Sequence, residues 1–374
     1  MSLAGSDNSV TPPLAPLTGI KVVEFGAIGP VPFAAMMLAD MGADVVRIAR
    51  PGSTFDAKAD VVLRGRRFIS LDLKQSHEKN TALELCRACD VLLEGYRPGV
   101  MERLGLGPDI CTTANPKLIY GRMTGWGQAG PLSTTPGHDI NFIALAGALH
   151  AIGNAGGPPV PPLNLLGDYG GGGMLLAFGV VCALLEVRRS GLGQVIDAAM
   201  VDGITSLMTQ YCGQLGKGQW SARRGENLFD GGAPWYATYE TADRKYVAVG
   251  AIEEPFWMDL LSLLGIDSSS LPARDERGAW DTIRNSLARQ FLKRTRAEWV
   301  KVFEGSQACV SPVLDLAEVS DHPHMATRAS FVVANGALQS APVPRLSRTP
   351  GRIRPATTGD GVLEQIRRDW RLSQ

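Results

Sequence analysis

Strand-like and helix-like segments alternate along the first part of the chain. Ile20–Phe25 is a compact apolar run, Pro32–Met41 has the pattern of a helix, and Ala43–Ile48 is a second strand-like run. Two neighbouring strands joined through a helix run parallel, so these segments predict one βαβ unit. The alternation continues through Phe68–Leu73, His77–Ala88, Asp90–Glu94 and Leu118–Met123. Its repetition predicts an α/β fold with a doubly wound, mostly parallel sheet and helices on both faces.

The character of the sequence changes in its second half. Trp235–Thr241 and Lys245–Gly250 are rich in aromatic and β-branched residues and flank a short turn, which predicts a β-hairpin. Helical patterns follow around Phe256–Leu264 and Arg296–Glu304. We therefore expect four parts, which are a flexible tail of residues 1–16, a large α/β domain of 17–226, a smaller α+β domain of 227–318, and a proline-rich segment of 319–374 that returns to the large domain.

The overall composition excludes several classes of protein. Charged residues make up 20% of the chain and apolar residues 45%, and Lys plus Arg equals Asp plus Glu at 37 each. Neither a disordered chain nor a nucleic-acid-binding surface is expected from these values. Gly173–Leu185 is apolar but short, and charged residues follow it from Glu186, so it predicts a buried helix and not a membrane span. We expect neither nucleic acid nor a membrane as a partner.

The six cysteines are spread along the chain, mostly in apolar helical contexts. Cys86 and Cys89 have the spacing of a metal or redox pair, but they lie in a helical pattern without a second pair or a histidine cluster. His322 and His324 flank a proline and also lack a cluster of carboxylates. We therefore expect buried thiols in a reducing compartment, the cytoplasm, and no metal site.

One stretch carries two residues suited to proton transfer. His138 lies in Gly137–Ile140, and Asp168, thirty residues later, leads into the glycine run Gly170–Gly173. A histidine and a carboxylate can each accept and donate a proton near neutral pH, and the N–H groups of a glycine-rich helix start can stabilise an oxyanion. This combination predicts chemistry through a carbanion or enolate. On the residue pattern alone, a structural histidine in a turn, with Asp168 as a helix N-cap, fits equally well.

Basic residues recur near the ends of the predicted strands, at Arg50, Arg64, Arg66, Arg67, Lys74, Arg97 and Arg103. The turn after the first strand lacks the G-x-G-x-x-G fingerprint, and Arg50 stands where a NAD site requires an acidic residue, so a NAD-dependent oxidoreductase is not expected. Because strand ends gather at one edge of a doubly wound sheet, these cations predict a site for a polyanionic ligand such as a phosphorylated adenosine. A simple solvent-facing role for Arg50 stays open.

Four long motifs resemble those of a known family. They are the runs 17–24, 38–48, 94–107 and 124–131. They resemble the family III CoA-transferase superfamily and, within it, the alpha-methylacyl-CoA racemases, with a likeness that covers nearly the whole chain from residue 17. The resemblance implies an acyl-CoA thioester substrate and no cofactor, because CoA is part of the substrate. It also implies an interlocked homodimer, with each active site between the large domain of one chain and the small domain of the other.

The resemblance also implies roles for individual residues. His138 and Asp168 would lie on opposite faces of the α-carbon of the thioester, and Glu253 of the small domain would lie near the histidine. CoA would bind the large domain at Arg50, Leu71, Asp72, Leu73, Lys74, Gly95, Tyr96, Arg97, Arg103, Gly137, Asp139, Ile140, Asn141 and Phe142.

The activity implied by the resemblance is that of a racemase, which interconverts (2R)- and (2S)-2-methylacyl-CoA thioesters by 1,1-proton transfer through an enolate. His138 would be the base that acts on the 2S epimer, and Asp168 the base that acts on the 2R epimer. The alternative on the same fold is a CoA-transferase that moves CoA between carboxylic acids through an acyl anhydride on Asp168. His138 favours the racemase, because a transferase needs a nucleophile and not a second base. A non-catalytic acyl-CoA-binding protein is the third possibility, and the presence of both titratable groups argues against it.

Overall fold

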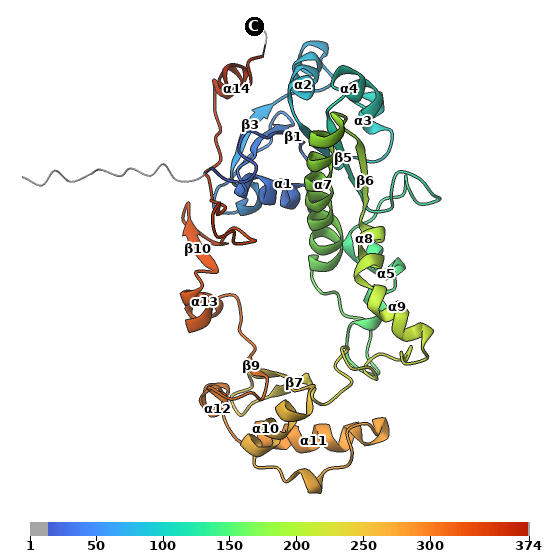
Figure 1. Ribbon diagram of the computed structural model, residues 1–374, viewed down its shortest axis with the longest axis vertical. Coiled ribbons are helices and arrows are strands. Elements are labelled where there is room, and N and C mark those ends of the chain that lie inside the picture. The colour runs from blue at the N-terminus through green and yellow to red at the C-terminus, as the bar shows by residue number, and fades with distance from the viewer. Residues whose placement is uncertain (1–13, 373–374) are drawn as a thin grey trace, which may run out of the picture. The chain divides into compact units, whose positions relative to one another are not determined.

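The computed structural model describes residues 14–372, which form two compact units. Unit 1 comprises residues 14–142, 164–206 and 327–372, and unit 2 comprises Ile143–Leu163 and Leu207–Ala326. The chain therefore leaves unit 1 and returns to it twice. Figure 1 shows the succession of the helices and strands by colour, from blue at the N-terminus to red at the C-terminus. The predicted flexible tail of residues 1–16 lies mostly outside the described residues.

Unit 1 is built on a six-stranded sheet in which every strand pairing is parallel. The strand order is β3-β2-β1-β4-β5-β6. The strands are β1 (Lys21–Phe25), β2 (Asp44–Ala49), β3 (Arg66–Ser70), β4 (Val91–Glu94), β5 (Ile119–Thr124) and β6 (Val195–Ala199). The direction of the order reverses between β1 and β4, so doubly wound folds bind their ligands at the carboxyl ends of these two strands. The predicted fold class of unit 1 is confirmed.

Helices cover both faces of this sheet. On one face, α1 (Pro30–Asp40) and α7 (Leu175–Ser190) contact the strands and each other. On the other face, α2 (Ser76–Ala88), α4 (Pro108–Ala114) and α14 (Val362–Trp370) contribute side chains to one buried cluster. Val23 and Phe25 of β1 belong to that second cluster. Since successive strand residues point to opposite faces, Val22 and Glu24 lie on the face that α1 covers.

Shorter elements complete unit 1 and its connections. They are the 3-10 turn η1 (Val61–Leu63), α3 (Val100–Arg103), α5 (Asp139–Leu145), the π-helix η2 (Leu165–Met174), α8 (Met200–Leu207), η5 (Val319–Asp321), α13 (Pro323–Thr327) and the antiparallel hairpin of β10 (Phe331–Ala334) and β11 (Ala337–Ser340).

Unit 2 has an antiparallel three-stranded sheet in the order β7-β8-β9, with helices packed on it. Its strands are β7 (Tyr236–Glu240), β8 (Tyr246–Gly250) and β9 (Val310–Pro312). Its helical elements are α6 (Ala148–Ala151), α9 (Thr209–Gly216), α10 (Glu254–Leu264), η3 (Ser268–Ser270), η4 (Arg277–Ala279), α11 (Trp280–Phe291) and α12 (Arg296–Phe303). Aromatic side chains fill the core, including Trp257, Phe291 and Trp299. The predicted hairpin is β7–β8, and the small part of the chain is α+β, as expected.

Two segments that the sequence placed in the large domain belong to unit 2, namely Ile143–Leu163 and residues 207–226. They are held together by hydrogen bonds. Arg224 donates from Nε to the carbonyl of His150 at 2.8 Å and from Nη1 to that of Gly157 at 2.6 Å. The His150 ring bonds the carbonyl of Ala222 at 2.8 Å. Because these contacts are polar and join residues 67 to 74 positions apart, the hydrophobic pattern of the sequence carried no sign of them.

Three of the arginines expected at the ligand edge have internal partners. Arg64 donates to both oxygens of Asp40, at 3.0 and 2.6 Å, and is buried. Arg66 is fully buried and donates from Nε to Glu24 at 3.1 Å. Arg67 pairs with Asp369 at 2.6 Å. The predicted ligand role of these arginines is wrong, because β3 begins at Arg66 and they therefore lie at its amino end, away from the carboxyl-end crevice.

The buried pair of Arg66 and Glu24 predicts a large effect on stability. Removing the cation with Arg66→Met leaves the fully buried Glu24 carboxylate with Arg47 as its remaining cationic partner. We expect the free energy of unfolding to fall by about 3–5 kcal/mol, measured by urea denaturation. Arg189→Met, which removes an exposed pair with Glu186, is the control and should leave the urea midpoint nearly unchanged. An unchanged midpoint for Arg66→Met would contradict the structural role.

The helical run Leu165–Ser190 is longer than the predicted apolar segment, because the glycine run is itself helical. By length and composition it is the one helix among residues 14–372 that could cross a membrane. It contacts α1, β5 and β6, as a helix that covers a sheet does. The prediction of a buried helix holds for one side only. Leu176, Ala177, Val180 and Ala183 are buried, whereas Phe178 and other apolar residues are exposed.

Candidate active site

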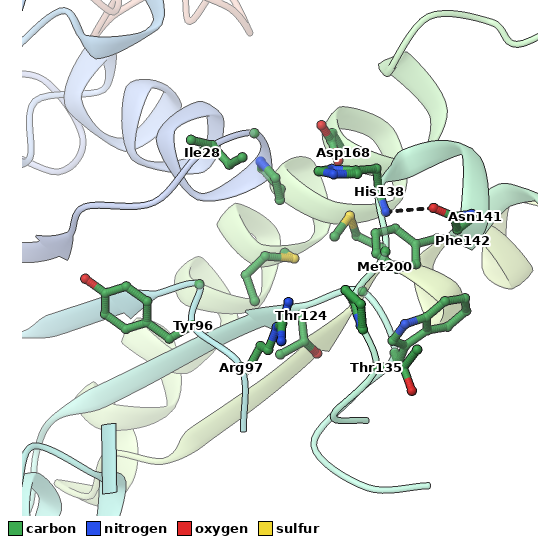
Figure 2. A pocket seen from close by; sticks show the side chains of 18 of the residues that line it. Ile28, Tyr96, Arg97, Thr124, Thr135, His138, Asn141, Phe142, Asp168 and Met200 are labelled. Carbon is green, nitrogen blue, oxygen red and sulfur yellow. Dashed lines mark hydrogen bonds between the residues drawn. The ribbon is translucent and has the colours of Figure 1, made fainter. Parts of the chain in front are cut away.

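A cavity of about 530 Å³ opens in unit 1 at the carboxyl ends of the central strands. It is lined by the turn after β1 (Ile28–Val31), the turn after β4 (Gly95–Pro98) and the end of β5 with the residues that follow (Met123–Trp126). The turn before α5, together with Asp168 and Met200, completes the lining (Figure 2). This is the position at which the reversal of strand order predicts a ligand site.

His138 lies in the turn that starts α5. Its backbone N–H donates to the side-chain oxygen of Asn141 at 3.0 Å, and its carbonyl accepts from the N–H groups of Asn141 and Phe142 at 2.8 and 3.3 Å. The backbone and Asn141 therefore cap the helix, so the imidazole is not needed for that purpose. Figure 2 shows the imidazole beside the carboxylate of Asp168. Of the two interpretations of His138, the structural one thus loses its main support.

The ring of Phe142 packs against the turn that carries His138. It is buried and packs edge-on against Trp126, with ring centroids 4.7 Å apart. A side chain at Gly125 or Gly137 would overlap the ring, because a Cβ atom there would lie 2.0 or 2.7 Å from it. Both glycines are therefore required for the ring of Phe142 to pack against the backbone that lines the cavity.

Asp168 lies in the first turn of the π-helix η2, and Asn164 precedes that helix. The Asn164 amide donates to Oδ2 of Asp168 at 3.0 Å. Burial raises the pKa of Asp168 above its usual range; the Asn164 bond lowers it, the nearby Asp139 carboxylate raises it, and His138 lowers it. A raised pKa keeps more of the carboxyl protonated near neutral pH, which suits a group that must both donate and accept a proton. Short π-helical segments often occur at functional sites.

Asp139 connects the two candidate residues. Its Oδ2 accepts hydrogen bonds from the backbone N–H groups of Gly167 and Asp168, each at 2.7 Å. The side chain is buried, with 7% of its surface exposed. The carboxylate is therefore used inside the protein, and any contact of this predicted CoA-binding residue with CoA would have to come from its backbone.

The glycine run does not offer free N–H groups as predicted. Gly170–Gly173 lie inside η2, where backbone N–H groups bond to carbonyls of the preceding turn. The glycines instead allow close packing. A Cβ atom at Gly172 would lie 3.0 Å from Pro30 and one at Gly173 would lie 2.7 Å from the Pro30 carbonyl. The proposed oxyanion role of this run is therefore wrong, because the helix starts five residues earlier than the pattern suggested.

Gly29 brings the start of α1 against Asp168. It has a φ of 69°, and a Cβ atom there would lie 2.9 Å from Oδ2 of Asp168. We expect Gly29→Ala to displace the carboxylate and to reduce turnover by about 10²-fold. Gly265→Ala is the matched control, since Gly265 has a φ of 67° and nothing within 4 Å of an added Cβ. Equal turnover in the two variants would contradict a displacement of Asp168 by the added methyl group.

Several of the predicted CoA-binding residues gather at the cavity. Gly95, Tyr96, Arg97, Gly137, Asn141 and Phe142 line it, and Ile140 lies in the first turn of α5. The turn after β4 is held by the buried Glu94, which accepts from the N–H of Tyr96 at 2.7 Å. Glu94 also accepts from Nε of Arg122 at 2.9 Å. Glu94 was not among the site residues predicted from the sequence, although an acidic residue at the end of an apolar strand was a visible signal.

The other predicted CoA-binding residues lie on turns nearby in unit 1. Burial raises the pKa of the Tyr96 hydroxyl, and the guanidinium of Arg50 beside it acts in the opposite direction. Arg50 also lines a second cavity of about 570 Å³. Arg103 ends α3, and in the turn after β3 the N–H of Lys74 donates to Asp72 at 3.1 Å. The side chains of Arg50, Lys74 and Arg103 are exposed, that of Leu73 is partly buried, and that of Leu71 belongs to the buried core.

Glu253 lies in unit 2, where it is the exposed N-cap residue of α10. Its proposed role beside His138 stays a prediction. Among residues 14–372, no group of three or more His, Cys, Asp or Glu side chains is arranged to hold a metal ion.

Comparison with known proteins identifies the family to which this chain belongs. Residues 17–358 match the CoA-transferase family III. This chain belongs to CoA-transferase family III. The family match spans unit 2 and most of unit 1, so both candidate site residues, His138 and Asp168, lie within it.

Individual relatives differ in how similar they are. The chain is 46% identical to the alpha-methylacyl-CoA racemase of Mus musculus over 355 residues, which are 94% of this chain and 92% of the mouse protein. It is 46% identical to that of Homo sapiens over 336 residues, 89% of this chain and 87% of the human protein. Identity to the acetyl-CoA:oxalate CoA-transferase of Acetobacter aceti is 29% over 344 residues, 87% of this chain and 88% of that protein.

The same fold occurs in a solved structure. A CAIB/BAIF family protein from Brucella suis superimposes with a TM-score of 0.82, covering 96% of this chain and all of that chain, at 22% identity. At this identity the likeness concerns the fold alone.

Proposed function

We propose that this chain is an alpha-methylacyl-CoA racemase, which interconverts (2R)- and (2S)-2-methylacyl-CoA thioesters. The observation that carries the proposal is the pairing of His138 and Asp168 in one cavity, where His138 lies close enough to lower the pKa of Asp168. The 46% identity to the mouse and human racemases, against 29% to a CoA-transferase, supports it.

The chemistry requires two groups that exchange roles. Inverting a stereocentre needs one base to remove the α-proton and one acid to deliver a proton to the opposite face. In the proposed mechanism, His138 removes the proton from the 2S hand while the protonated Asp168 delivers one. The roles reverse for the 2R hand. The raised pKa of Asp168 supports its acid role, because a carboxyl group with a raised pKa keeps its proton up to a higher pH.

The enolate oxygen needs a donor other than the glycine run. We infer that the first-turn N–H groups of α5, at Asp139 and Ile140, take this role. Helix α5 begins directly after His138, and the first N–H groups of a helix have no carbonyl partner within it. The helix dipole adds partial positive charge at the same end. These donors would lie on the same turn as the base that generates the enolate.

Exposed cations would bind the phosphates of CoA. Arg50, Lys74, Arg97 and Arg103 are exposed and follow β2, β3 and β4, and Arg97 lines the cavity. Their placement on carboxyl-end turns is the arrangement expected for a polyanionic ligand. CoA is part of the substrate, so no separate cofactor is proposed.

We also propose a homodimer in which the small part of one chain supplies Glu253 to the other. The outer side of the helical run Leu165–Ser190 supports an association of copies. Met174 at the end of η2 and Phe178, Val181 and Leu185 of α7 recur at helical spacing and are 51%, 66%, 40% and 62% exposed. A contiguous apolar stripe of this kind is typical of an interaction surface. The cytoplasm is the proposed location, since all six cysteines are free thiols.

Proton NMR in deuterium oxide tests the function. A single-handed 2-methylacyl-CoA is incubated with the protein, and the α-proton signal is followed together with the ratio of the two hands. Loss of the signal with epimerisation is the expected result. An intact α-proton, with CoA moving to an added free acid, would instead identify a CoA-transferase. Neither event would point to a non-catalytic binding protein.

A further inference from the structure

The carboxylate of Asp139 has an unusual set of neighbours. It is buried, and one oxygen accepts two backbone N–H bonds from residues almost thirty positions later in the chain. The other oxygen, Oδ1, is buried and has no hydrogen-bond partner among the described residues. Buried carboxylates normally have partners for both oxygens, so an unpaired one calls for an explanation.

Packing around the carboxylate is tight. A Cβ atom at Gly167 would lie 2.5 Å from Oδ2 of Asp139, so only glycine at this position lets the carboxylate reach the two N–H groups. Asp139 directly follows His138, and its carboxylate directly bonds the N–H of Asp168. Two hydrogen bonds of 2.7 Å thus join the backbones that carry the two proposed acid–base groups.

We propose that Asp139 is a positioning residue: its buried carboxylate holds Gly167 and Asp168 against the His138 turn and places a fixed negative charge beside Asp168. The proposal rests on the proposed function for its catalytic meaning. Asp139 does not contact substrate in this role. It acts through the backbone of Asp168 and through the electrostatic field at that carboxyl group.

The neighbours of Asp168 make the charge effect specific. The two titratable groups that act on Asp168 are Asp139 and His138, which are consecutive residues of one turn. Asp168 faces the backbone of Gly29, the N-cap residue of α1, and the uncharged Met200 of α8 lines the same cavity. The Asp139 charge raises the pKa of Asp168 and His138 lowers it. Removing the charge at residue 139 should therefore lower the pKa of Asp168.

Two substitutions separate the two effects. Asp139→Ala removes the acceptor and the charge, whereas Asp139→Asn keeps an oxygen acceptor and removes the charge. Gly167→Ala keeps Asp139 but pushes its carboxylate away. Asp267→Asn is the matched control, because Asp267 also accepts a backbone N–H, from Ser269 at 3.0 Å, but in an exposed turn of unit 2. Each purified full-length variant is assayed with both hands of a 2-methylacyl-CoA.

The expected results differ among the variants. Asp139→Ala and Gly167→Ala should lose about 10²-fold in kcat with KM within a few-fold of wild type. In Asp139→Asn, the acidic limb of the pH profile for α-proton exchange from the 2R hand should move to lower pH, because Asp168 then ionises at lower pH. In amide hydrogen exchange, the peptide covering residues 165–174 should lose protection in Asp139→Ala and keep it in Asp139→Asn.

The outcomes that overturn the proposal are distinct from failure of the proposed function. An acidic limb at the wild-type pH in Asp139→Asn, or kcat of Asp139→Ala within a few-fold of wild type, would overturn it. A wild-type protein that exchanges no α-proton would refute the racemase function. Hydrogen exchange would then still decide whether Asp139 holds the Asp168 backbone, since unchanged protection of residues 165–174 in Asp139→Ala would contradict it.

Discussion

Replacing either proposed base, with His138→Gln or Asp168→Asn, is expected to reduce racemisation by at least about 10³-fold. The two groups would act on opposite faces of one carbon, so neither can substitute for the other. Binding of the acyl-CoA should survive, because the exposed cations on the turns after β2, β3 and β4 are unchanged. Racemisation is measured by the ratio of the two hands, and binding by isothermal titration calorimetry.

Single-handed substrates make this prediction sharper. In deuterium oxide, His138→Gln should retain some exchange of the α-proton from the 2R hand, which Asp168 would deprotonate. Asp168→Asn should retain it from the 2S hand. His77→Gln is the control, since His77 lies on the surface of α2 with its side chain 79% exposed. Near-normal racemisation in both site variants would refute the two-base assignment. Residual exchange from the same epimer in both variants would refute the assignment of His138 to the 2S epimer and Asp168 to the 2R epimer.

Placing charges in the apolar stripe of α7 is expected to dissociate the proposed homodimer into monomers. Phe178→Asp combined with Val181→Asp puts two carboxylates where exposed apolar side chains now lie. Burying an unpaired charge in an interface costs several kcal/mol, about enough to abolish association. If Glu253 acts across the dimer, racemisation should be lost together with the dimer. Analytical ultracentrifugation gives the mass, and the NMR exchange experiment gives the activity.

The control for this experiment is another exposed apolar residue. Leu316 is 83% exposed and lies in unit 2, away from the α7 stripe in the sequence. Leu316→Asp should leave both mass and activity unchanged. A wild-type protein that sediments as a monomer would rule out the homodimer. A double variant that stays dimeric would place the interface on a different surface.

Much of the fold could be predicted because its signals are local. Ile20–Phe25 and Ala43–Ile48 are apolar runs of strand length, and the structure has β1 and β2 there. The hairpin of β7 and β8 was visible in its aromatic and β-branched residues. Hydrophobic periodicity depends on neighbours a few residues apart, so it can be read without knowing the fold. The segments Ile143–Leu163 and 207–226 join unit 2 through polar contacts, which leave no such period.

The acid–base residues of the candidate site could be predicted from the sequence, but the packing and hydrogen bonds that hold them in place could not. His138 and Asp168 were chosen for their types and context, and both line the cavity. The helical state of Gly170–Gly173 could not be inferred, because glycine disfavours helices and its presence there is explained by contacts with α1 and α8. The hydrogen bonds of Asp139 were equally invisible, since they join residues 28 and 29 positions apart.

The sequence by itself determined the succession of strands and helices along the first 123 residues, the fold class and the pair of residues suited to proton transfer. Only the tertiary structure decided which arginines can meet a ligand. Arg66 and Arg50 are the same residue type near strand ends, yet Arg66 is buried with Glu24 and Arg50 is exposed. The reason is that local backbone geometry sets the face of a strand or helix on which a side chain lies, whereas packing between distant segments sets which partners that side chain meets.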